Sequence, residues 1–410
     1  MKKLYILMIV LFAFNAGNAQ WIELNPGTHN ELYGIYFTDI NTGYAVGSNG
    51  TIIKTLNGGN NWSDLTTGIS EVLLSIQFPN PSTGYAVGTN GTIIKTIDYG
   101  NTWEIKSYDT AYQLNSIFFT DANNGYAVGI TIDSISNYIF YGIILKTVNG
   151  GSTWTKLYFG PNNAGITSVF FTDANNGYAG GINVFLKTTN GGLTWIDTIN
   201  APSNLYSLFF VNANTGYLTA DAGICKTIDA GHTWVPIYYS PYIGSITHIY
   251  FPSINTGYAI GDHSLILKTS NAGSSWTVQD YAYSSYDAYN SVYFINENIG
   301  FIVGSKQFGG GGFIYKTING GVTNISEIST NENIILSPNP ATSKLTINLQ
   351  QLSKLQNTTV SIYDVQEKLL LQQCITQPQT ELNIASFAKG IYVVKVNNDK
   401  QSMVNKFVKE

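Results

Sequence analysis

The acidic residues that could carry chemistry in this chain are few. Asp221 and Asp262 stand at comparable places in two successive repeats, and His263 directly follows Asp262. Hydrolysis of a glycosidic bond needs two carboxyl groups ~5–10 Å apart on either side of that bond. These three residues are therefore the candidate catalytic set, although no motif singles them out and surface acids usually serve only for solvation.

The other reactive side chains favour neither a metal nor a cofactor. His248 takes a Ser or Gly position of an inner strand, so we expect a hydrogen-bonded interior residue rather than a base. Cys225 replaces an apolar strand residue and is expected to be buried, while Cys374 lies in the other half of the chain. The turn at residues 121–125 loosely resembles a calcium loop but lacks the liganding Glu.

Aromatic residues, above all tyrosines, gather between the expected strands. Tyr supplies rigid contact area with a polar tip, and loops on a rigid scaffold are where binding usually resides. We therefore expect a Tyr-rich platform for a sugar ring or an extended peptide. The alternative is that these side chains plug an axial channel and pack on each other. The candidate binding residues are Tyr108, Tyr112, Tyr138, Phe140, Tyr141, Tyr158, Tyr238, Tyr239, Tyr242, Tyr281, Tyr283 and Tyr286.

A repeat must position these residues. In six units a Lys-Thr step precedes a Trp that stands eight residues after the Lys, as in Lys54 and Trp62. A seventh unit has Lys316 but Asn324 at the Trp position, and the missing Trp is found near the other end, as Trp21. The tryptophans of the chain are Trp21, Trp62, Trp103, Trp154, Trp195, Trp234 and Trp276.

Each unit is expected to form four antiparallel strands. In the first unit these are Leu32–Phe37, residues 43–47, residues 51–55 and a strand that begins at the Trp; an Asn-Gly turn joins the second to the third. The unit length matches a propeller blade, and no polar capping repeats suggest a solenoid. We expect an all-β protein with a seven-bladed β-propeller over residues 20–324, in which Trp21–Leu24 completes the last blade beside Phe313–Thr317.

The turn before each Trp resembles the Asp-box of bacterial neuraminidase repeats, as in Thr96-Ile-Asp98-Tyr-Gly100-Asn-Thr102-Trp103. A short polar side chain can accept backbone N–H bonds across such a turn, so we expect a structural role. Sialidases hold the substrate carboxylate with arginines, and all 20 basic residues here are lysines, so sialidase activity is disfavoured. The residues at the Asp position are Asn57, Asp98, Asn149, Asn190, Asp229, Asn271 and Asn319.

The lysines of the Lys-Thr steps form one column with two interpretations. They could form a charged ring that binds anions. The favoured interpretation is that their stems cover apolar strand edges while the ammonium groups reach water or carboxylates.

The whole unit, with Gly-Tyr-Ala-Val-Gly, Lys-Thr and Asn-Gly-Gly-x-Thr-Trp, resembles the photosystem II assembly and stability factor family of propellers over residues 21–324. That family is thought to hold its client with a basic patch containing Arg. Residues 20–330 carry 10 lysines against 19 acidic residues, so the client role is not expected here. The same acidity argues against a nucleic-acid partner.

The two ends of the chain predict export. Residues 1–19 read as a signal peptide: two lysines, an apolar run too short to span a bilayer, and small residues before the cleavage point. After a polar linker at residues 325–333, residues 334–410 contain Ser-Pro-Asn-Pro, Gly-Ile-Tyr-Val-Val-Lys and a terminal Lys-Phe-Val-Lys. They resemble the type A C-terminal sorting domain of the type IX secretion system.

The sorting-domain resemblance implies an Ig-like β-sandwich that the secretion machinery recognises and a sortase-like peptidase removes, with cleavage within residues 324–336. The expected location is the medium or the outer-membrane surface of a Gram-negative bacterium. We expect a monomeric, non-enzymatic propeller that binds carbohydrate, peptide or an envelope protein, without cofactor, metal or transmembrane helix. The alternatives are a glycosidase or lyase acting on the irregular-loop rim, and a chaperone-like assembly scaffold.

Overall fold

The computed structural model describes residues 21–106, 111–132, 140–197, 202, 204–221, 223–242, 244–280, 287–307, 310–321, 334–349, 358–364, 369–397 and 402–410. The named regular elements are all β-strands, and these residues include no helix long and apolar enough to cross a membrane. The chain divides into two compact units, Ala19–Val322 and Thr323–Glu410. The expected signal peptide and the linker at residues 325–333 lie outside the described residues.

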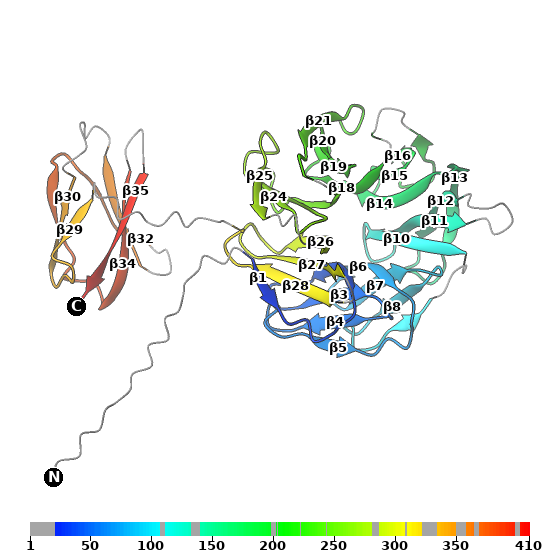
Figure 1. The fold of residues 1–410 in the computed structure, drawn as a ribbon, viewed down its shortest axis with the longest axis horizontal. Helices are drawn as coiled ribbons and strands as arrows, with labels where there is room; N and C mark the ends of the chain where they lie inside the picture. Colours follow the sequence, from blue (N-terminus) through cyan, green and yellow to red (C-terminus); the bar gives the residue numbers. More distant parts are fainter. Residues whose placement is uncertain are drawn as a thin grey trace, which may run out of the picture. The chain divides into compact units, whose positions relative to one another are not determined.

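The described strands of the first unit form seven four-stranded sheets with antiparallel pairing, which we number in chain order (Figure 1). Sheets 1 to 4 contain β2 (Leu32–Phe37), β3 (Gly43–Gly47), β4 (Ile52–Thr55) and β5 (Ser63–Leu65); β6 (Leu73–Asn80), β7 (Thr83–Gly88), β8 (Ile93–Thr96) and β9 (Glu104–Ile105); β10 (Tyr112–Phe119), β11 (Gly125–Ile132), β12 (Phe140–Thr147) and β13 (Thr155–Asn162); and β14 (Gly165–Phe171), β15 (Gly177–Ile182), β16 (Val184–Thr188) and β17 (Ile196–Asp197).

Sheets 5 to 7 follow the same order, except that the last strand of sheet 7 comes from the start of the chain. They contain β18 (Leu205–Phe210), β19 (Gly216–Ala220), β20 (Gly223–Thr227) and β21 (Val235–Tyr239); β22 (Ile246–Tyr250), β23 (Gly257–Gly261), β24 (Ile266–Thr269) and β25 (Thr277–Asp280); and β26 (Ala288–Phe294), β27 (Gly300–Lys306), β28 (Gly311–Thr317) and β1 (Ile22–Leu24).

The sheets stand around a central axis, and the ring is closed. Each first strand contacts the first strand of the next sheet, and β26 of sheet 7 contacts β2 of sheet 1. The strand β1 pairs antiparallel with β28, placing Ile22 opposite Lys316 and Leu24 opposite Ile314. This is the pairing that the isolated Trp21 predicted, and it joins the two ends of the unit in one sheet.

Apolar side chains fill the space between neighbouring sheets. Between sheets 1 and 2, for example, Tyr44, Val46 and Ile52 pack against Leu73 and Phe78. Sheets 7 and 1 share a core of the same kind, in which Phe301 and Ile314 meet Leu32 and Phe37. Because each sheet is covered on both faces, its strands are apolar on both sides, and the all-β propeller architecture expected from the repeat is present.

The glycines that flank each second strand are dictated by close contacts. A Cβ atom added to Gly43 would lie 2.5 Å from the Phe37 ring, and one added to Gly47 would lie 1.8 Å from the carbonyl oxygen of Glu31. A side chain at Gly43 would displace the Phe37 ring, and one at Gly47 would displace the backbone of the neighbouring strand. The Gly-Tyr-Ala-Val-Gly pattern therefore reflects packing of the second strand against the first.

Each first strand carries a β-bulge near its start. In sheet 1 the pairing with β3 shifts between Leu32 and Gly34, and the other six sheets show the same shift at the equivalent place. A bulge breaks the simple alternation of side chains. As a result Leu32 and Ile35 both point between sheets, whereas Tyr33, Gly34 and Tyr36 line the axis of the ring.

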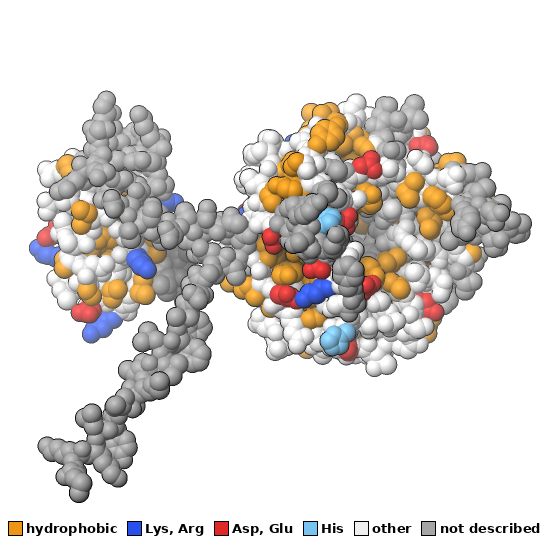
Figure 2. All heavy atoms as spheres, viewed as in Figure 1, with side chains coloured by type: hydrophobic (Ala, Val, Ile, Leu, Met, Phe, Trp, Pro, Cys, Tyr) orange, Lys and Arg blue, Asp and Glu red, His pale blue; other side chains and the backbone are white. Residues whose placement is uncertain are grey.

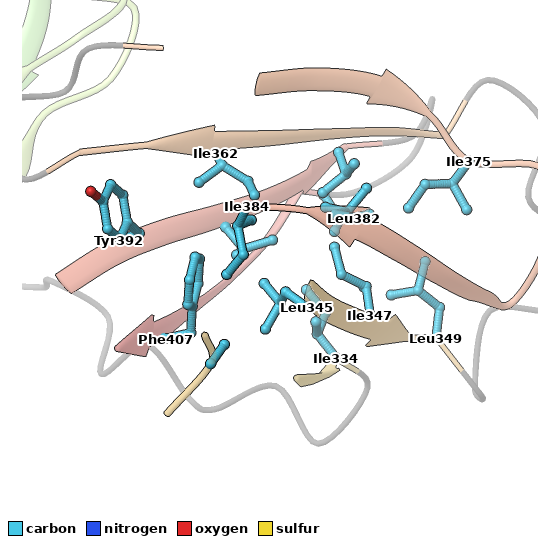
Figure 3. Packing of buried hydrophobic residues seen from close by; sticks show 14 residues of the cluster. Ile334, Leu345, Ile347, Leu349, Ile362, Ile375, Leu382, Ile384, Tyr392 and Phe407 are labelled. Carbon is cyan, nitrogen blue, oxygen red and sulfur yellow. The ribbon is translucent and has the colours of Figure 1, made fainter. Parts of the chain in front are cut away.

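The second unit consists of two sheets that share one core. One contains β29 (Ile335–Ser337), β30 (Lys344–Asn348) and β33 (Gln379–Asn383), and the other β32 (Leu369–Cys374), β31 (Thr359–Tyr363), β34 (Gly390–Asn397) and β35 (Ser402–Lys409). Figure 3 shows Leu345 and Ile347 of the first sheet facing Ile362 and Phe407 of the second across this core. The fully buried apolar residues make this unit a domain with its own interior.

Candidate functional site

The segment between the third and fourth strands of each sheet, which we call the box, is held by its own side chains. In sheet 1 the Thr55 hydroxyl donates to Asn57 Oδ1 at 3.0 Å and accepts the Gly59 N–H at 2.9 Å. Asn57 Oδ1 also accepts the N–H of Asn61 at 2.9 Å. The side chains of Asp98, Asn149, Asn190, Asp229 and Asn271 accept the equivalent N–H groups at 2.9–3.0 Å.

Two of the boxes carry a carboxylate instead of an amide. The N–H and hydroxyl of Thr102 lower the pKa of Asp98 to about 2, and the corresponding bonds from Thr233 lower the pKa of Asp229. A carboxylate that accepts several hydrogen bonds in its charged form resists protonation. The two carboxylates therefore hold the turn in their charged form.

The tryptophans after the boxes pack with their edges toward a first-strand Phe. Trp62 lies 6.0 Å from Phe37 between ring centroids, with the planes nearly perpendicular. Trp21 takes the same place in sheet 7, 5.9 Å from Phe294. Trp62 donates its indole N–H to Gly59 O at 3.1 Å, whereas the other six buried indole N–H groups have no acceptor among the described residues.

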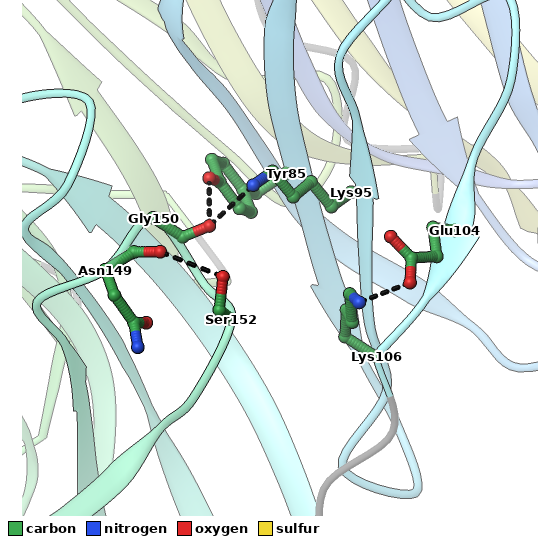
Figure 4. A network of polar contacts seen from close by, with 7 residues as sticks. All are labelled: Tyr85, Lys95, Glu104, Lys106, Asn149, Gly150 and Ser152. Carbon is green, nitrogen blue, oxygen red and sulfur yellow. Dashed lines mark hydrogen bonds and ion pairs between the residues drawn. The ribbon is translucent and has the colours of Figure 1, made fainter.

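The box of each sheet is also bound by the preceding sheet. In sheet 2 the Tyr85 hydroxyl and the Lys95 ammonium both donate to the carbonyl of Gly150, each at 2.7 Å (Figure 4). The same Lys–Tyr clasp on one carbonyl recurs from Tyr44 and Lys54 to Tyr99 O. It is formed likewise by Tyr126 and Lys146, Tyr178 and Lys187, Tyr217 and Lys226, and Tyr258 and Lys268.

This clasp corrects the interpretation of the lysine column. The ammonium groups were expected to reach water or carboxylates, but each donates to a backbone carbonyl in the next sheet and lies above an aromatic ring, as Lys95 does 5.5 Å from the Tyr85 centroid. In sheet 7 the Tyr is replaced by Phe301, and Lys316 alone binds Gly58 O at 2.7 Å. The lysines are therefore structural ties around the ring.

The boxes and the turns between the first two strands lie on one rim, which we call the box rim. The N–H of Gly58 in the box donates to Asn41 O in that turn at 2.8 Å, and every other sheet has the equivalent bond. In the turn at residues 121–125, Asp121 Oδ1 accepts the N–H groups of Asn123 and Asn124 at 2.7 and 2.9 Å and so holds the turn together.

The opposite rim, which we call the variable rim, carries the loops between the second and third strands and those between sheets. Tyr239 ends β21 there and is 74% exposed. Tyr238 and Tyr242 are only partly exposed and pack on the core between sheets 5 and 6. Tyr158 packs on the core between sheets 3 and 4, while Phe140 and Tyr141 in β12 are partly exposed.

The remaining members of the expected platform differ in position. Tyr112 is 7% exposed and belongs to the core between sheets 2 and 3, so it offers no contact area to a ligand. Five candidates lie outside the described residues: Tyr108, Tyr138, Tyr281, Tyr283 and Tyr286. Tyr239 is thus the most exposed described member of the set.

Two of the three candidate catalytic residues share a recess. A recess of about 500 Å³ on the variable rim is lined by Asp262 and His263 together with Glu31, Tyr33 and Lys306, but not by Asp221. Asp262 Oδ2 accepts the Ser245 N–H at 2.9 Å. Asp221 Oδ1 accepts the side-chain N–H of Asn204 at 2.9 Å. Each acid therefore holds the loop that precedes a first strand.

A cavity of about 320 Å³ runs along the axis of the ring and is lined by residues of all seven first strands. Asn115, Thr167 and Tyr206 line it toward the variable rim, because first strands begin at that rim. One step further in, Ser75, Ser207 and His248 belong to a ring of small polar side chains. Burial in the cavity lowers the pKa of His248 to about 4, and its Nδ1 accepts the Val292 N–H at 3.5 Å.

At the box-rim end, six aromatic side chains surround the axis. Neighbouring rings of this aromatic collar have centroids 5.0–5.3 Å apart, and only Gln77 interrupts the circle. The hydroxyls of its three tyrosines donate to carbonyls of the next sheet at 3.0–3.1 Å. The collar consists of Tyr36, Phe118, Phe170, Phe209, Tyr250 and Tyr293.

On one face of the ring, acidic side chains with lysine and histidine among them lie around the centre (Figure 2). The sequence pointed to Asp262 and His263 on this unit, and of the residues that line the axial cavity it singled out only His248. A sequence pattern for the collar is nevertheless present. The fifth residue of each first-strand segment, counted from Leu32 in Leu32–Phe37 and from the equivalent residue in the other sheets, is Phe, Tyr or Gln. The bulge hid it by moving these residues off the face that strict alternation assigns.

Comparison with known proteins gives two family matches. A model of the photosynthesis system II assembly factor YCF48 matches residues 60–165, and a model of the secretion system C-terminal sorting domain matches residues 336–410. No curated protein matches the sequence significantly.

Several solved structures share the fold. A structure of YCF48 bound to D1 peptide is 17% identical, with a TM-score of 0.58 over 73% of this chain and 97% of that one. YCF48 from Cyanidioschyzon merolae is 18% identical, with a TM-score of 0.57 over 72% of this chain and 98% of its own. An ancestral GH74 enzyme is 14% identical, with a TM-score of 0.53 over 94% of this chain and 63% of its own.

At such identities the structural likeness establishes the fold and nothing about activity. The C-terminal match indicates that the chain is exported, because sorting domains of this kind direct export. The chain therefore combines a β-propeller similar to that of the photosynthesis system II assembly factor YCF48 with a type IX secretion system C-terminal sorting domain.

Proposed function

We propose that this chain is a secreted or surface-displayed seven-bladed β-propeller without enzymatic activity, which binds a carbohydrate, peptide or envelope protein through its variable rim. The signal peptide would occupy residues 1–19, the propeller residues 20–324 and an Ig-like sorting domain residues 334–410. A sortase-like peptidase of the secretion machinery would remove that domain at the outer membrane of a Gram-negative bacterium.

The contrast between the rims carries this proposal. On the box rim the recurring polar groups bond to the framework, as at Gly150 O, which receives both Tyr85 and Lys95. The variable rim instead presents Tyr239 at 74% exposure and is the rim from which the first strands enter the cavity. A peptide ligand gains support from the YCF48 structure with D1 peptide, although that protein is only 17% identical.

An array of glycans, peptides and envelope fractions probed with the secreted chain tests the proposal. We expect binding to one class of probe, and we expect the Tyr239→Ala, Tyr242→Ala, Tyr283→Ala triple variant to lose most of it. A matched triple change on the box rim, Leu56→Ala, Ile97→Ala and Ile228→Ala, should leave binding intact. Equal binding by both triple variants would remove the variable rim as the site.

The second candidate, a glycosidase or lyase, is favoured by one observation: Asp262, His263 and Glu31 share one recess. Release of reducing ends from a glycan panel measures this activity. The binding proposal expects none. Activity that disappears in Asp262→Asn but persists in Asp221→Asn would establish the enzyme instead.

A further inference from the structure

The axial cavity is lined in a regular way, which distinguishes it from a packing defect. All seven first strands contribute to it, and the described residues that line it include no Asp, Glu, Lys or Arg. An ion entering the cavity would lose its hydration without gaining an opposite charge, which is strongly unfavourable. The cavity therefore selects for a neutral occupant.

Hydroxyl groups form a belt around the middle of the cavity. Serines occupy the equivalent position on five of the seven strands, His248 on a sixth and Gly34 on the seventh. The Ser75 and Ser207 hydroxyl oxygens accept N–H groups of the next strand, at 3.4 and 3.3 Å, and so keep their own hydrogens for donation. The belt serines are Ser75, Ser116, Ser168, Ser207 and Ser291.

Below the belt, the aromatic collar surrounds the axis with aromatic carbon. Its Tyr36, Tyr250 and Tyr293 hydroxyls are already bound to carbonyls, so the collar presents carbon surface to the cavity. Hydroxyl groups above aromatic carbon match the two sides of a sugar ring, which has polar edges and apolar C–H faces. A purely apolar ligand would leave the belt hydroxyls without partners.

The volume of the cavity limits the size of the ligand. A cavity of about 320 Å³ lies at the lower end of the roughly 300–1,000 Å³ that is usual for ligand sites. It suits one terminal unit of a glycan, not an internal stretch of polymer. Tyr206 stands at the mouth with 38% of its surface exposed, where it can contact the next unit outward.

We propose that the axial cavity binds one neutral sugar unit at the end of a glycan, entering from the variable rim with a ring face on the aromatic collar and its hydroxyls on the serine belt. This site rests on the proposed binding function and names its ligand class and location. Neither depends on catalysis.

Calorimetric titration of the full secreted chain with neutral monosaccharides, each alone, tests this site. We expect one sugar to bind, and Ser116→Leu, which fills the belt, to weaken it at least about tenfold. Ser274→Leu is the matched control, since Ser274 is exposed in the box of sheet 6, at the position that Leu193 occupies in sheet 4. It should bind like the wild type. Ser116→Ala, which leaves the packing undisturbed, should show a smaller but measurable loss.

The outcomes separate the two proposals. Sugar binding that Ser116→Leu and Ser116→Ala leave unchanged would overturn the cavity site while leaving the variable rim as a binder. No binding of any neutral sugar would also overturn it, and the array would then decide the wider function by itself. If Ser116→Leu does not fold, as judged by circular dichroism, Ser116→Ala and a crystal structure with the sugar decide instead.

Discussion

The box rim and the variable rim are built from the same seven units, yet they use their polar groups in opposite ways. On the box rim, side chains bind backbone within the box, and Lys and Tyr bind it across to the next sheet. On the variable rim, loops differ between sheets, and Asp221 and Asp262 each hold a different loop. Repetition therefore makes one rim rigid and leaves the other free to vary.

This difference predicts that stability and binding are controlled by different residues. Opening any one interface between neighbouring sheets would open the ring, and the box rim contributes hydrogen bonds at all seven interfaces. The variable rim can change in sequence at little cost, because its exposed side chains contribute little to folding. Three changes can break or sharpen this comparison.

The largest effect is expected for Trp62→Ala. Trp62 is 8% exposed and packs on Phe37 in the core between sheets 7 and 1, so its removal leaves a large cavity. We expect a loss of about 3–5 kcal/mol in the free energy of unfolding, measured by denaturant titration. Tyr239→Ala on the variable rim is the control and should change it by no more than about 0.5 kcal/mol. Similar losses in both would deny the division between rims.

A second effect concerns His248 in the cavity. Its pKa is lowered from 6.5 to about 4 by burial, so the unfolded chain binds more protons between these values. Stability should therefore be constant above about pH 6.5 and fall as the pH drops toward 4, by roughly 1–3 kcal/mol. Unfolding free energies at several pH values measure this. His248→Gln should flatten that part of the profile, and an unchanged slope would place the titrating group elsewhere.

The smallest effect comes from the incomplete clasp of sheet 7. Phe301 occupies the place of the clasp tyrosines, opposite Lys316 as Tyr85 is opposite Lys95. A hydroxyl there would reach Gly58 O, so Phe301→Tyr should raise the free energy of unfolding by about 0.5–1.5 kcal/mol. Tyr85→Phe should lower it by a similar amount. A loss of stability in Phe301→Tyr would show that the seam between sheets 7 and 1 is built differently.

The sequence was informative about the framework because the framework repeats. The spacing of Lys54 and Trp62 predicted the sheet unit, and the isolated Trp21 predicted the pairing of β1 with β28, since a missing strand must be supplied from somewhere. The sorting domain was predicted on different grounds, because several short motifs occur in a fixed order in residues 334–410.

The sites were less accessible to sequence. Lys95 donates to the carbonyl of Gly150, which lies 55 residues later in the chain. Because a long lysine side chain can contact many distant groups, no local sequence pattern identifies this partner. Likewise Tyr112 stands in an apparent loop but is buried, because β10 begins earlier than the apolar stripe suggested. The aromatic collar depends on a bulge in every first strand, and bulges follow from sheet packing that a single strand does not reveal.

The most direct test compares two equally exposed side chains, one on each rim. Tyr239 at the variable rim and Leu193 in a box are 74% and 69% exposed, so neither is needed for the core. Binding of the Tyr239→Ala and Leu193→Ala variants to the partner found on the array should be measured side by side. We predict that Tyr239→Ala weakens binding and Leu193→Ala does not. Loss of binding in Leu193→Ala alone would contradict the assignment of the two rims.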